Sequence, residues 1–198
     1  MKQKEIVFAT NNPHKLKEIR EIIGELFLVR SLEDISCLED IPEDAETLEE
    51  NAAFKARFVY DKYGYDCFAD DTGLEIDALG GRPGVRSARY AGEDCVSENN
   101  IRKVLKEMEY VSDRRARFRT VISLIRNGHE TLFEGVVEGT ILKEKHGEGG
   151  FGYDPIFLPQ GQAKSFAQMK PDEKNRISHR GRAMQKLIAA LERAPLLP

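Results

Sequence analysis

The chain has 198 residues, of which 40% are hydrophobic and 32% are charged, and its formal net charge at pH 7 is -4. A chain of this length can bury a sizeable core, and we predict a single domain over residues 1–198. The net negative charge argues against general nucleic-acid binding, which favours basic surfaces.

The cysteines and the hydropathy pattern indicate a cellular compartment. Cys37, Cys67 and Cys95 form no CxxC pair and are odd in number. They argue against a disulfide framework or a zinc site and fit a reducing cytoplasm. The N-terminus enters a predicted strand almost at once, without a signal peptide, and no apolar run approaches the length of a membrane span. We therefore predict a cytoplasmic protein with no membrane partner.

The first predicted elements form a potential anion site. The apolar run 5–9 predicts a buried strand, and the polar loop Thr10-Asn11-Asn12 follows it. Asn12 and Pro13 are typical of the N-cap and the first residue of a helix. Free backbone N–H groups and the helix dipole favour an anion at such an end. Lys15 opposes that dipole, so it indicates a nearby anion, with a solvated surface lysine as the alternative.

A second helix is predicted to open at Thr47 and to end at Gly64. The spacing of Thr47 and Glu50 is that of a capping box, which gives Glu50 a structural alternative to ligand binding. Asn51 and Lys55 share one face of this helix, one turn apart. Glu43 lies in the preceding loop, where a solvated acid is the alternative.

The acidic doublet Asp70-Asp71 is the stretch around which the chain is organised. It follows the segment 66–69, which is predicted to be a short buried strand, and it precedes Thr72 and Gly73. Neighbours in a strand point to opposite faces, so only one of the two carboxylates faces any given cleft. A carboxylate at a strand end can hold Mg²⁺ or take a proton from water. The alternative is a turn acid before Gly73.

The C-terminal half combines long strands with a glycine-dense loop. The runs 117–125 and 131–141 are strand-like, and Asn127-Gly128 between them predicts a type I′ hairpin. Phe151 and Tyr153 flank a glycine in the loop 147–155. Aromatic rings in a mobile loop can stack on a flat ligand, and simple packing within the loop is the equal alternative.

The last predicted helix begins with basic residues. Ser178 is typical of an N-cap, so His179 and Arg180 lie in the first turn, and Lys174 lies just upstream. Basic groups in a first turn oppose the helix dipole, which is a local violation of the kind found at functional sites. Helix ends and lysines suit phosphate, carboxylates suit Mg²⁺, and the loop aromatics suit a nucleobase. The residues therefore predict a Mg²⁺-dependent enzyme that acts on a nucleoside phosphate.

Six motifs together resemble the inosine triphosphate pyrophosphatase family, which clears non-standard purine nucleotides. The resemblance runs in order from Phe8 to about Leu191, and six blocks in sequence are highly specific. The blocks are FATNNPHK (8–15), ENAAFKA (50–56), ADDTGL (69–74), GGRPGVRSARYAG (80–92), GGFGYDPI (149–156) and SHRG (178–181). Thr72 stands where many members have serine, which keeps the hydroxyl group.

This resemblance implies an α/β fold with a long curved mixed sheet flanked by helices and two lobes with a central cleft. It also implies a homodimer and hydrolysis of a nucleoside triphosphate to the monophosphate and pyrophosphate. The substrates would be ITP, dITP and XTP. Attack by water at the α-phosphorus needs positioning and charge stabilisation rather than a covalent nucleophile.

The resemblance also implies roles for individual residues. Asp71 would be the catalytic base and a Mg²⁺ ligand, with Glu43 as a second ligand and Glu50 as a nearby candidate. The phosphates would be held by Thr10, Asn11, Asn12, Pro13, His14, Lys15, Lys55 and Thr72. The base would lie between Phe151 and Tyr153, beside Gly152, and its edge would be read by Asp154, Lys174, His179 and Arg180.

Two other functions remain open at this point. A pyrophosphatase for modified pyrimidine or 7-methylguanosine triphosphates, as in the related Maf family, would use a similar fold. A non-catalytic nucleotide sensor belongs to another class, but it has no need to retain Asp71, Glu43, Lys15 and Lys55 together. A panel of nucleotides separates the first alternative, and pyrophosphate release separates the second.

Overall fold

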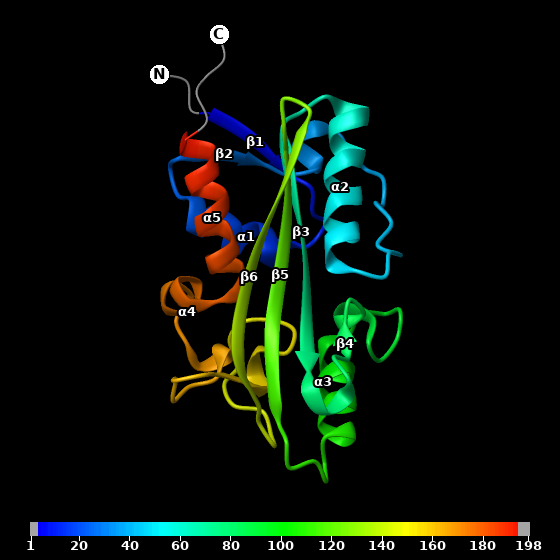
Figure 1. The fold of residues 1–198 in the computed structure, drawn as a ribbon, viewed down its shortest axis with the longest axis vertical. Coiled ribbons are helices and arrows are strands. Elements are labelled where there is room, and N and C mark those ends of the chain that lie inside the picture. Colours follow the sequence, from blue (N-terminus) through cyan, green and yellow to red (C-terminus); the bar gives the residue numbers. More distant parts are fainter. Residues whose placement is uncertain (1–3, 194–198) are drawn as a thin grey trace. The chain divides into compact units, whose positions relative to one another are not determined.

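The computed structural model describes residues 4–193 and confirms the predicted α/β class, with a mixed sheet and flanking helices (Figure 1). The α-helices are α1 (Pro13–Ile23), α2 (Leu48–Tyr63), α3 (Ser97–Glu107), α4 (Pro171–Ile177) and α5 (His179–Arg193). The strands are β1 (Lys4–Phe8), β2 (Phe27–Arg30), β3 (Cys67–Ile76), β4 (Pro83–Gly84), β5 (Arg115–Arg126), β6 (His129–Ile141) and β7 (Phe157–Pro159). The 3₁₀ helices are η1 (Glu33–Ile35), η2 (Asp77–Leu79), η3 (Ser87–Arg89), η4 (Asp154–Ile156) and η5 (Phe166–Gln168).

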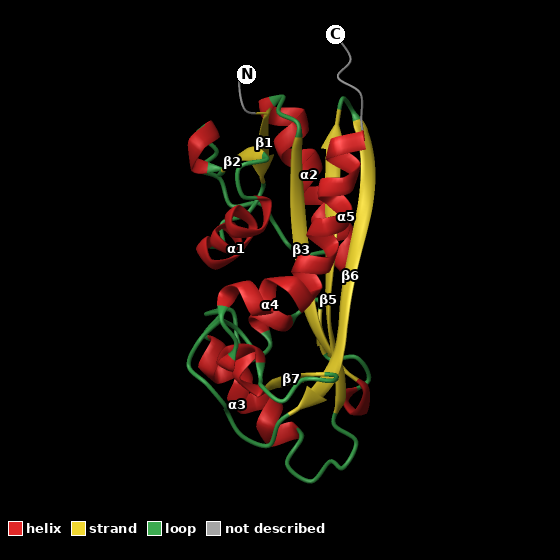
Figure 2. Ribbon diagram, turned by 90° about the vertical axis from the view of Figure 1, so that its left-hand side faces the viewer, coloured by secondary structure: helices red, strands yellow, loops and turns green. Residues whose placement is uncertain are grey.

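The sheet is mixed in strand direction. Its order is β2-β1-β3-β5-β6-β7, and β4 pairs with β3 outside this path. β1 runs parallel to both β2 and β3, whereas β7 pairs antiparallel with β6. Figure 2 shows β7 as a short strand beside the end of β6. Asn127 and Gly128 both have positive φ, at 48° and 77°, which confirms the predicted type I′ hairpin between β5 and β6.

Contacts divide the chain into two compact units. Within the described residues, unit 1 contains 4–71, 120–135 and 180–193, and unit 2 contains 72–119 and 136–179. The division falls within β3, β5 and β6.

Unit 1 has a core on each face of its part of the sheet because the side chains of β1 alternate. Ile6 and Phe8 pack with α1 and α5, whereas Val7 and Ala9 pack with α2. Figure 1 shows α5 and α1 on one side of β1 and α2 on the other. The alternation of a strand therefore places two different helix layers around the segment that leads into α1.

Local signals in the sequence set the ends of the two helices that matter for the site. Asn12 is the N-cap of α1 and Pro13 is its first residue, as predicted. Thr47 caps α2 by accepting a hydrogen bond from the Glu50 N–H, and Gly64 ends it with φ at 71°. These caps place Lys15 in the first turn of α1 and Asn51 in the first turns of α2.

Unit 2 has its own hydrophobic core, which is rich in aromatic side chains. Phe118 of β5 contacts Phe157 of β7 with ring centroids 4.7 Å apart, and Phe166 lies beside both. Tyr153 is part of this core, although it belongs to the glycine-dense loop. Among the described residues, no helix is long and apolar enough to cross a membrane.

Candidate active site

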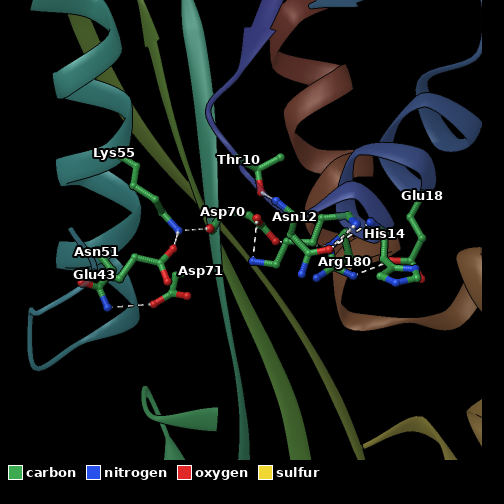
Figure 3. A network of polar contacts seen from close by, with 11 residues as sticks. Thr10, Asn12, His14, Glu18, Glu43, Asn51, Lys55, Asp70, Asp71 and Arg180 are labelled. Carbon is green, nitrogen blue, oxygen red and sulfur yellow. Dashed lines mark hydrogen bonds and ion pairs between the residues drawn. The ribbon is translucent and has the colours of Figure 1, made fainter. Parts of the chain in front are cut away.

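The acidic doublet lies inside β3 rather than at a strand end, so that part of the prediction was wrong. β3 continues from Cys67 to Ile76, and Asp70 and Asp71 are exposed by only 0% and 7%. Two adjacent acids are rare within a buried strand, because an unpaired buried charge is costly. Cations and amides from other elements make the arrangement possible. The two side chains point to opposite faces, as expected for neighbours in a strand (Figure 3).

Asp70 is the buried acceptor of an ion-pair network. Its carboxylate accepts hydrogen bonds from Lys15 Nζ at 2.9 Å and from Arg180 Nε at 3.2 Å. Arg180 is itself fully buried and also binds Glu18 of α1. Burial alone would raise the pKa of Asp70, but Lys15 and Arg180 outweigh it and hold the pKa well below its usual range. Asp70 is therefore ionised and orients Lys15.

Lys55 is the second buried cation of unit 1. Its ammonium group donates to the Asp70 backbone carbonyl at 2.7 Å and to the carboxylate of Glu43. Burial opposes the charged form, yet the negative charges of Asp71, Glu43 and Asp70 raise the pKa of Lys55 above its usual value. The protein therefore keeps a full positive charge beside Asp71.

Asp71 faces α2 and the segment that carries Glu43. Its Oδ2 accepts a hydrogen bond of 3.0 Å from Asn51 Nδ2. Burial raises the pKa of Asp71, and the attraction of Lys55 offsets this only in part. A carboxylate with a raised pKa is a stronger base than an ordinary one, so Asp71 is suited to accept a proton from water.

The N-terminus of α1 is shaped by the predicted polar loop. The side chain of Asn12 accepts hydrogen bonds from the backbone N–H of His14 at 2.9 Å and of Lys15 at 3.2 Å. Thr10 Oγ1 accepts from the Asn12 N–H, and Asn11 is exposed and contacts Asp40. The loop is thus held by its own side chains at the positive end of the helix dipole, where phosphate binds well.

Glu43 and Glu50, the two candidates for a second metal ligand, lie in different surroundings. Glu43 is half-buried beside Lys55, and its charge contributes to raising the pKa of Asp71. Glu50 is exposed, and its N–H donates to the hydroxyl oxygen of Thr47, which is one of the two bonds of the predicted capping box. Its carboxylate accepts from the Thr47 hydroxyl group rather than from the Thr47 backbone N–H. No cluster of three or more His, Cys, Asp or Glu side chains suited to a metal occurs in 4–193. Asp71 and Glu43 fit Mg²⁺, because it usually takes one or two carboxylates together with substrate phosphates.

Unit 2 places a buried ion pair beside aromatic rings. Asp154 Oδ2 accepts hydrogen bonds from Lys174 Nζ at 2.7 Å and from the Phe151 N–H at 2.9 Å. Lys174 also lies over the rings of Phe151 and Phe166, 4.8 and 5.8 Å from their centroids. This cation–π contact covers one face of the Phe151 ring and holds the ring beside the ammonium group of Lys174.

The sequence predicted that the glycine-dense loop 147–155 is mobile, but hydrogen bonds and packing hold it in place. Tyr153 is only 4% exposed, and its hydroxyl donates to the Ser87 carbonyl at 2.8 Å. Gly149 donates its N–H to the carbonyl of Ala167. Packing within the loop therefore describes Tyr153, whereas Phe151 is half-buried.

A substitution at Gly150 should test how much this loop depends on close packing. A Cβ at Gly150 would lie 2.1 Å from Asp154 Oδ2, and φ is +70°. We expect Gly150→Ala to displace the Asp154 carboxylate and to lower the free energy of unfolding in urea by about 2 kcal/mol or more. Gly161→Ala is the matched control, because φ is +77° but no atom lies within 4 Å. Equal losses in both variants would show that backbone strain alone matters.

The predicted residues divide into two groups, one in each unit. Unit 1 gathers Thr10, Asn11, Asn12, Pro13, His14, Lys15, Glu43, Glu50, Lys55, Asp71 and Arg180 on β1, α1, α2, β3, α5 and their loops. Unit 2 holds Thr72, Phe151, Gly152, Tyr153, Asp154, Lys174 and His179. Arg180 contacts Asp70 and Glu18, and His179 stacks on Phe118 at 4.5 Å. That His179 and Arg180 read the edge of a base stays a prediction.

Some residues that contact these two groups were not predicted to be functional. Asn51, Glu18 and Phe166 contact Asp71, Arg180 and Lys174 respectively. For Asn51 the sequence did contain a signal, since it shares a helix face with Lys55. Glu18 carried none, because its partner Arg180 lies 162 residues away in the sequence, and Phe166 lies in no motif that pointed to Lys174.

Fold and site define an α/β protein with a buried carboxylate–lysine network in unit 1 and aromatic rings around a buried ion pair in unit 2. The chain belongs to the Ham1 family, whose model matches residues 6–190. The dITP/XTP pyrophosphatase of Christiangramia forsetii is 53% identical over 188 residues, which cover 95% of this chain and 99% of the relative. The dITP/XTP pyrophosphatase of Bacillus subtilis is 48% identical, over 96% of this chain and 98% of the relative.

Solved structures agree with this assignment. The Ham1 protein of Staphylococcus aureus is 41% identical, covers 96% of this chain and 98% of its own, and superposes with a TM-score of 0.86. A HAM1 protein from Coxiella burnetii is also 41% identical, over 96% of this chain and 100% of its own, with a TM-score of 0.88. The family resemblance and the fold predicted from the six motifs are confirmed.

Proposed function

We propose that this chain hydrolyses non-standard purine nucleoside triphosphates such as ITP, dITP and XTP to the monophosphate and pyrophosphate. The observation that carries this proposal is the geometry around Asp71: its buried carboxylate accepts a hydrogen bond from Asn51, and the buried ammonium group of Lys55 is held at the neighbouring Asp70 carbonyl and at Glu43. The dITP/XTP pyrophosphatases of Christiangramia forsetii and Bacillus subtilis support the substrate class, because they are 53% and 48% identical to this chain over nearly its whole length.

The residues of unit 1 would carry out the hydrolytic step. Asp71 accepts the proton of the water that attacks the α-phosphorus, and the charge of Lys55 keeps the carboxylate available at neutral pH. Lys15 and the N-terminus of α1 neutralise charge on the phosphates, because phosphoryl transfer needs mainly positioning and charge stabilisation. Asp71 and Glu43 would hold Mg²⁺, with Glu50 as the less suited candidate. When bound, Mg²⁺ would neutralise negative charge on the phosphate oxygens.

The residues of unit 2 would recognise the base. The ring of Phe151 would lie against the face of the base. Tyr153, which is buried, would support the loop that carries Phe151. Lys174 would donate toward an oxo group, with Asp154 fixing the ammonium and His179 nearby in sequence. A donor suits the 6-oxo group of hypoxanthine and xanthine and leaves the 6-amino group of adenine unpaired.

The assembly and the compartment are also proposals. The resemblance of the motifs supports a homodimer, and the three unpaired cysteines support a reducing cytoplasm. Light scattering of the purified protein measures its mass directly. A mass of one chain at micromolar concentration would contradict the dimer.

A substrate panel tests the proposed function and both alternatives. We expect dITP, ITP and XTP to be hydrolysed at least about 10²-fold more efficiently than ATP, in kcat/KM, with Mg²⁺ present. Preference for modified pyrimidine or 7-methylguanosine triphosphates would favour a Maf-like activity. Tight nucleotide binding without pyrophosphate release would favour a sensor.

The position of attack can be read from the products. If water attacks the α-phosphorus, hydrolysis of dITP in ¹⁸O-water should place the label in dIMP, and no dIDP should form. Mass spectrometry of both products measures this. Label found only in pyrophosphate would indicate attack at the β-phosphorus and would contradict the proposed step.

A further inference from the structure

One face of α2 attaches the Glu43 segment to β3 through two buried side chains. Asn51 and Lys55 lie one helical turn apart and are 1% and 4% exposed (Figure 3). Asn51 Oδ1 accepts from the Ala45 N–H at 3.0 Å, while its Nδ2 donates to Asp71 Oδ2 at 3.0 Å. Lys55 likewise links Glu43 to the Asp70 carbonyl. Each residue therefore spans from the segment 43–45 to the doublet.

The two links differ in chemistry. The Lys55–Glu43 link is an ion pair, and a cation held by the Glu43 carboxylate would compete with the ammonium group for it. The Asn51 link joins a backbone N–H to a carboxylate through a neutral amide, so it does not compete for charge. Asn51 can therefore keep the segment attached to Asp71 whichever partner the Glu43 carboxylate has.

We propose that Asn51 is a positioning residue for the hydrolytic step. Its amide fixes one oxygen of Asp71, and therefore the plane of the carboxylate. Through Ala45 the same amide fixes the segment that carries Glu43. A single side chain thus sets the placement of both carboxylates relative to each other. This inference rests on the proposed function for the role of Asp71, whereas the attachment of the segment does not.

The alternative is a purely structural role, in which Asn51 only satisfies buried polar groups. Asn100 of α3 does this elsewhere, because its side chain accepts from the Ala91 N–H at 2.6 Å and donates to the Ala88 carbonyl at 2.8 Å. Both asparagines are almost fully buried and each connects two points of the chain. Asn100 is therefore the matched control for the loss of a bridging amide.

Two substitutions separate the two hydrogen bonds of Asn51. Asn51→Asp keeps an acceptor for the Ala45 N–H but places a second carboxylate oxygen against Asp71, which adds like charge or a shared proton at that contact, and Asn51→Ala loses both hydrogen bonds without adding charge. We expect hydrogen exchange within residues 40–46 to rise about tenfold or more in Asn51→Ala and to stay near wild type in Asn51→Asp. In both variants kcat for dITP should fall by about 10- to 100-fold with KM changed by less than about threefold, since a misplacement of about 1 Å can cost that much. Asn100→Ala should leave exchange within 40–46 unchanged.

The outcomes distinguish this inference from the proposed function. Wild-type protein that releases no pyrophosphate from dITP would defeat the proposed function, while the exchange of residues 40–46 still tests the attachment. Active wild type with an unchanged kcat in Asn51→Ala would overturn the positioning role. So would unchanged exchange in a folded Asn51→Ala variant. A loss of kcat in Asn51→Ala, which adds no charge beside Asp71, with KM within about threefold of wild type is the result that a structural role does not produce.

Discussion

Asp71→Asn should lower turnover of dITP by about 10²-fold or more, which is the usual scale for a positioned base. The substitution keeps the shape of the side chain and an acceptor for Asn51, but it removes the charge and the basicity. Steady-state release of pyrophosphate measures the effect. Asp77→Asn is the control, because Asp77 is an exposed acid a few residues further along the chain. Near-normal turnover in Asp71→Asn would refute the assignment of the base.

The same substitution should not weaken the fold. Burial raises the pKa of Asp71, so the folded state holds this proton more tightly than the unfolded state does. The stability contributed by the group therefore falls as pH rises from the ordinary carboxyl pKa through the raised one, and the buried carboxylate costs stability at pH values above the raised pKa. We expect Asp71→Asn to unfold at the same temperature as wild type or higher at pH 7. A clearly lower midpoint at pH 7 would contradict this account of the carboxylate.

The ends of α1 and α2 could be predicted because their signals are local. Asn12 and Pro13 begin α1, and Thr47 and Gly64 bound α2, each through bonds to residues a few positions away. Such caps depend on one side chain and the neighbouring backbone, so they can be recognised without knowing the tertiary structure.

The course of β3 through the doublet could not be predicted from local pattern. Two adjacent acids contradict a buried strand until their partners are known. Asp70 finds Lys15 and Arg180 at separations of 55 and 110 residues. Tertiary contacts therefore override the polar character of the segment, and the strand continues to Ile76.

The contacts around Asp154 were predicted in part. The loop motif identified Phe151 and Asp154, and their contact is local. α4 was missed, because a helix of seven residues, Pro171–Ile177, is too short to show an amphipathic period. Its position is what brings Lys174 to Asp154, so the ion pair was not visible in the sequence.

Lys174→Met should destabilise unit 2 strongly, because it leaves the carboxylate of Asp154 buried without its ammonium partner. The two side chains are only 6% and 4% exposed, and the contact is 2.7 Å long. Removing one partner of such a pair typically costs about 3–5 kcal/mol, whereas an exposed pair contributes about 0–1 kcal/mol. Urea unfolding measures the loss, and Lys164→Met at an exposed lysine that lies 3.9 Å from Glu173 is the control.

The double variant Lys174→Met with Asp154→Asn separates charge from packing. Asparagine keeps an acceptor for the Phe151 N–H but carries no charge, so no buried carboxylate remains unpaired. We expect the double variant to recover at least half of the stability lost by Lys174→Met, while hydrolysis of dITP stays low because the ammonium donor is gone. Recovery of activity along with stability would show that Lys174 only supports the fold and does not contact the base. A loss below about 1 kcal/mol in Lys174→Met itself would show that the pair is solvated rather than buried.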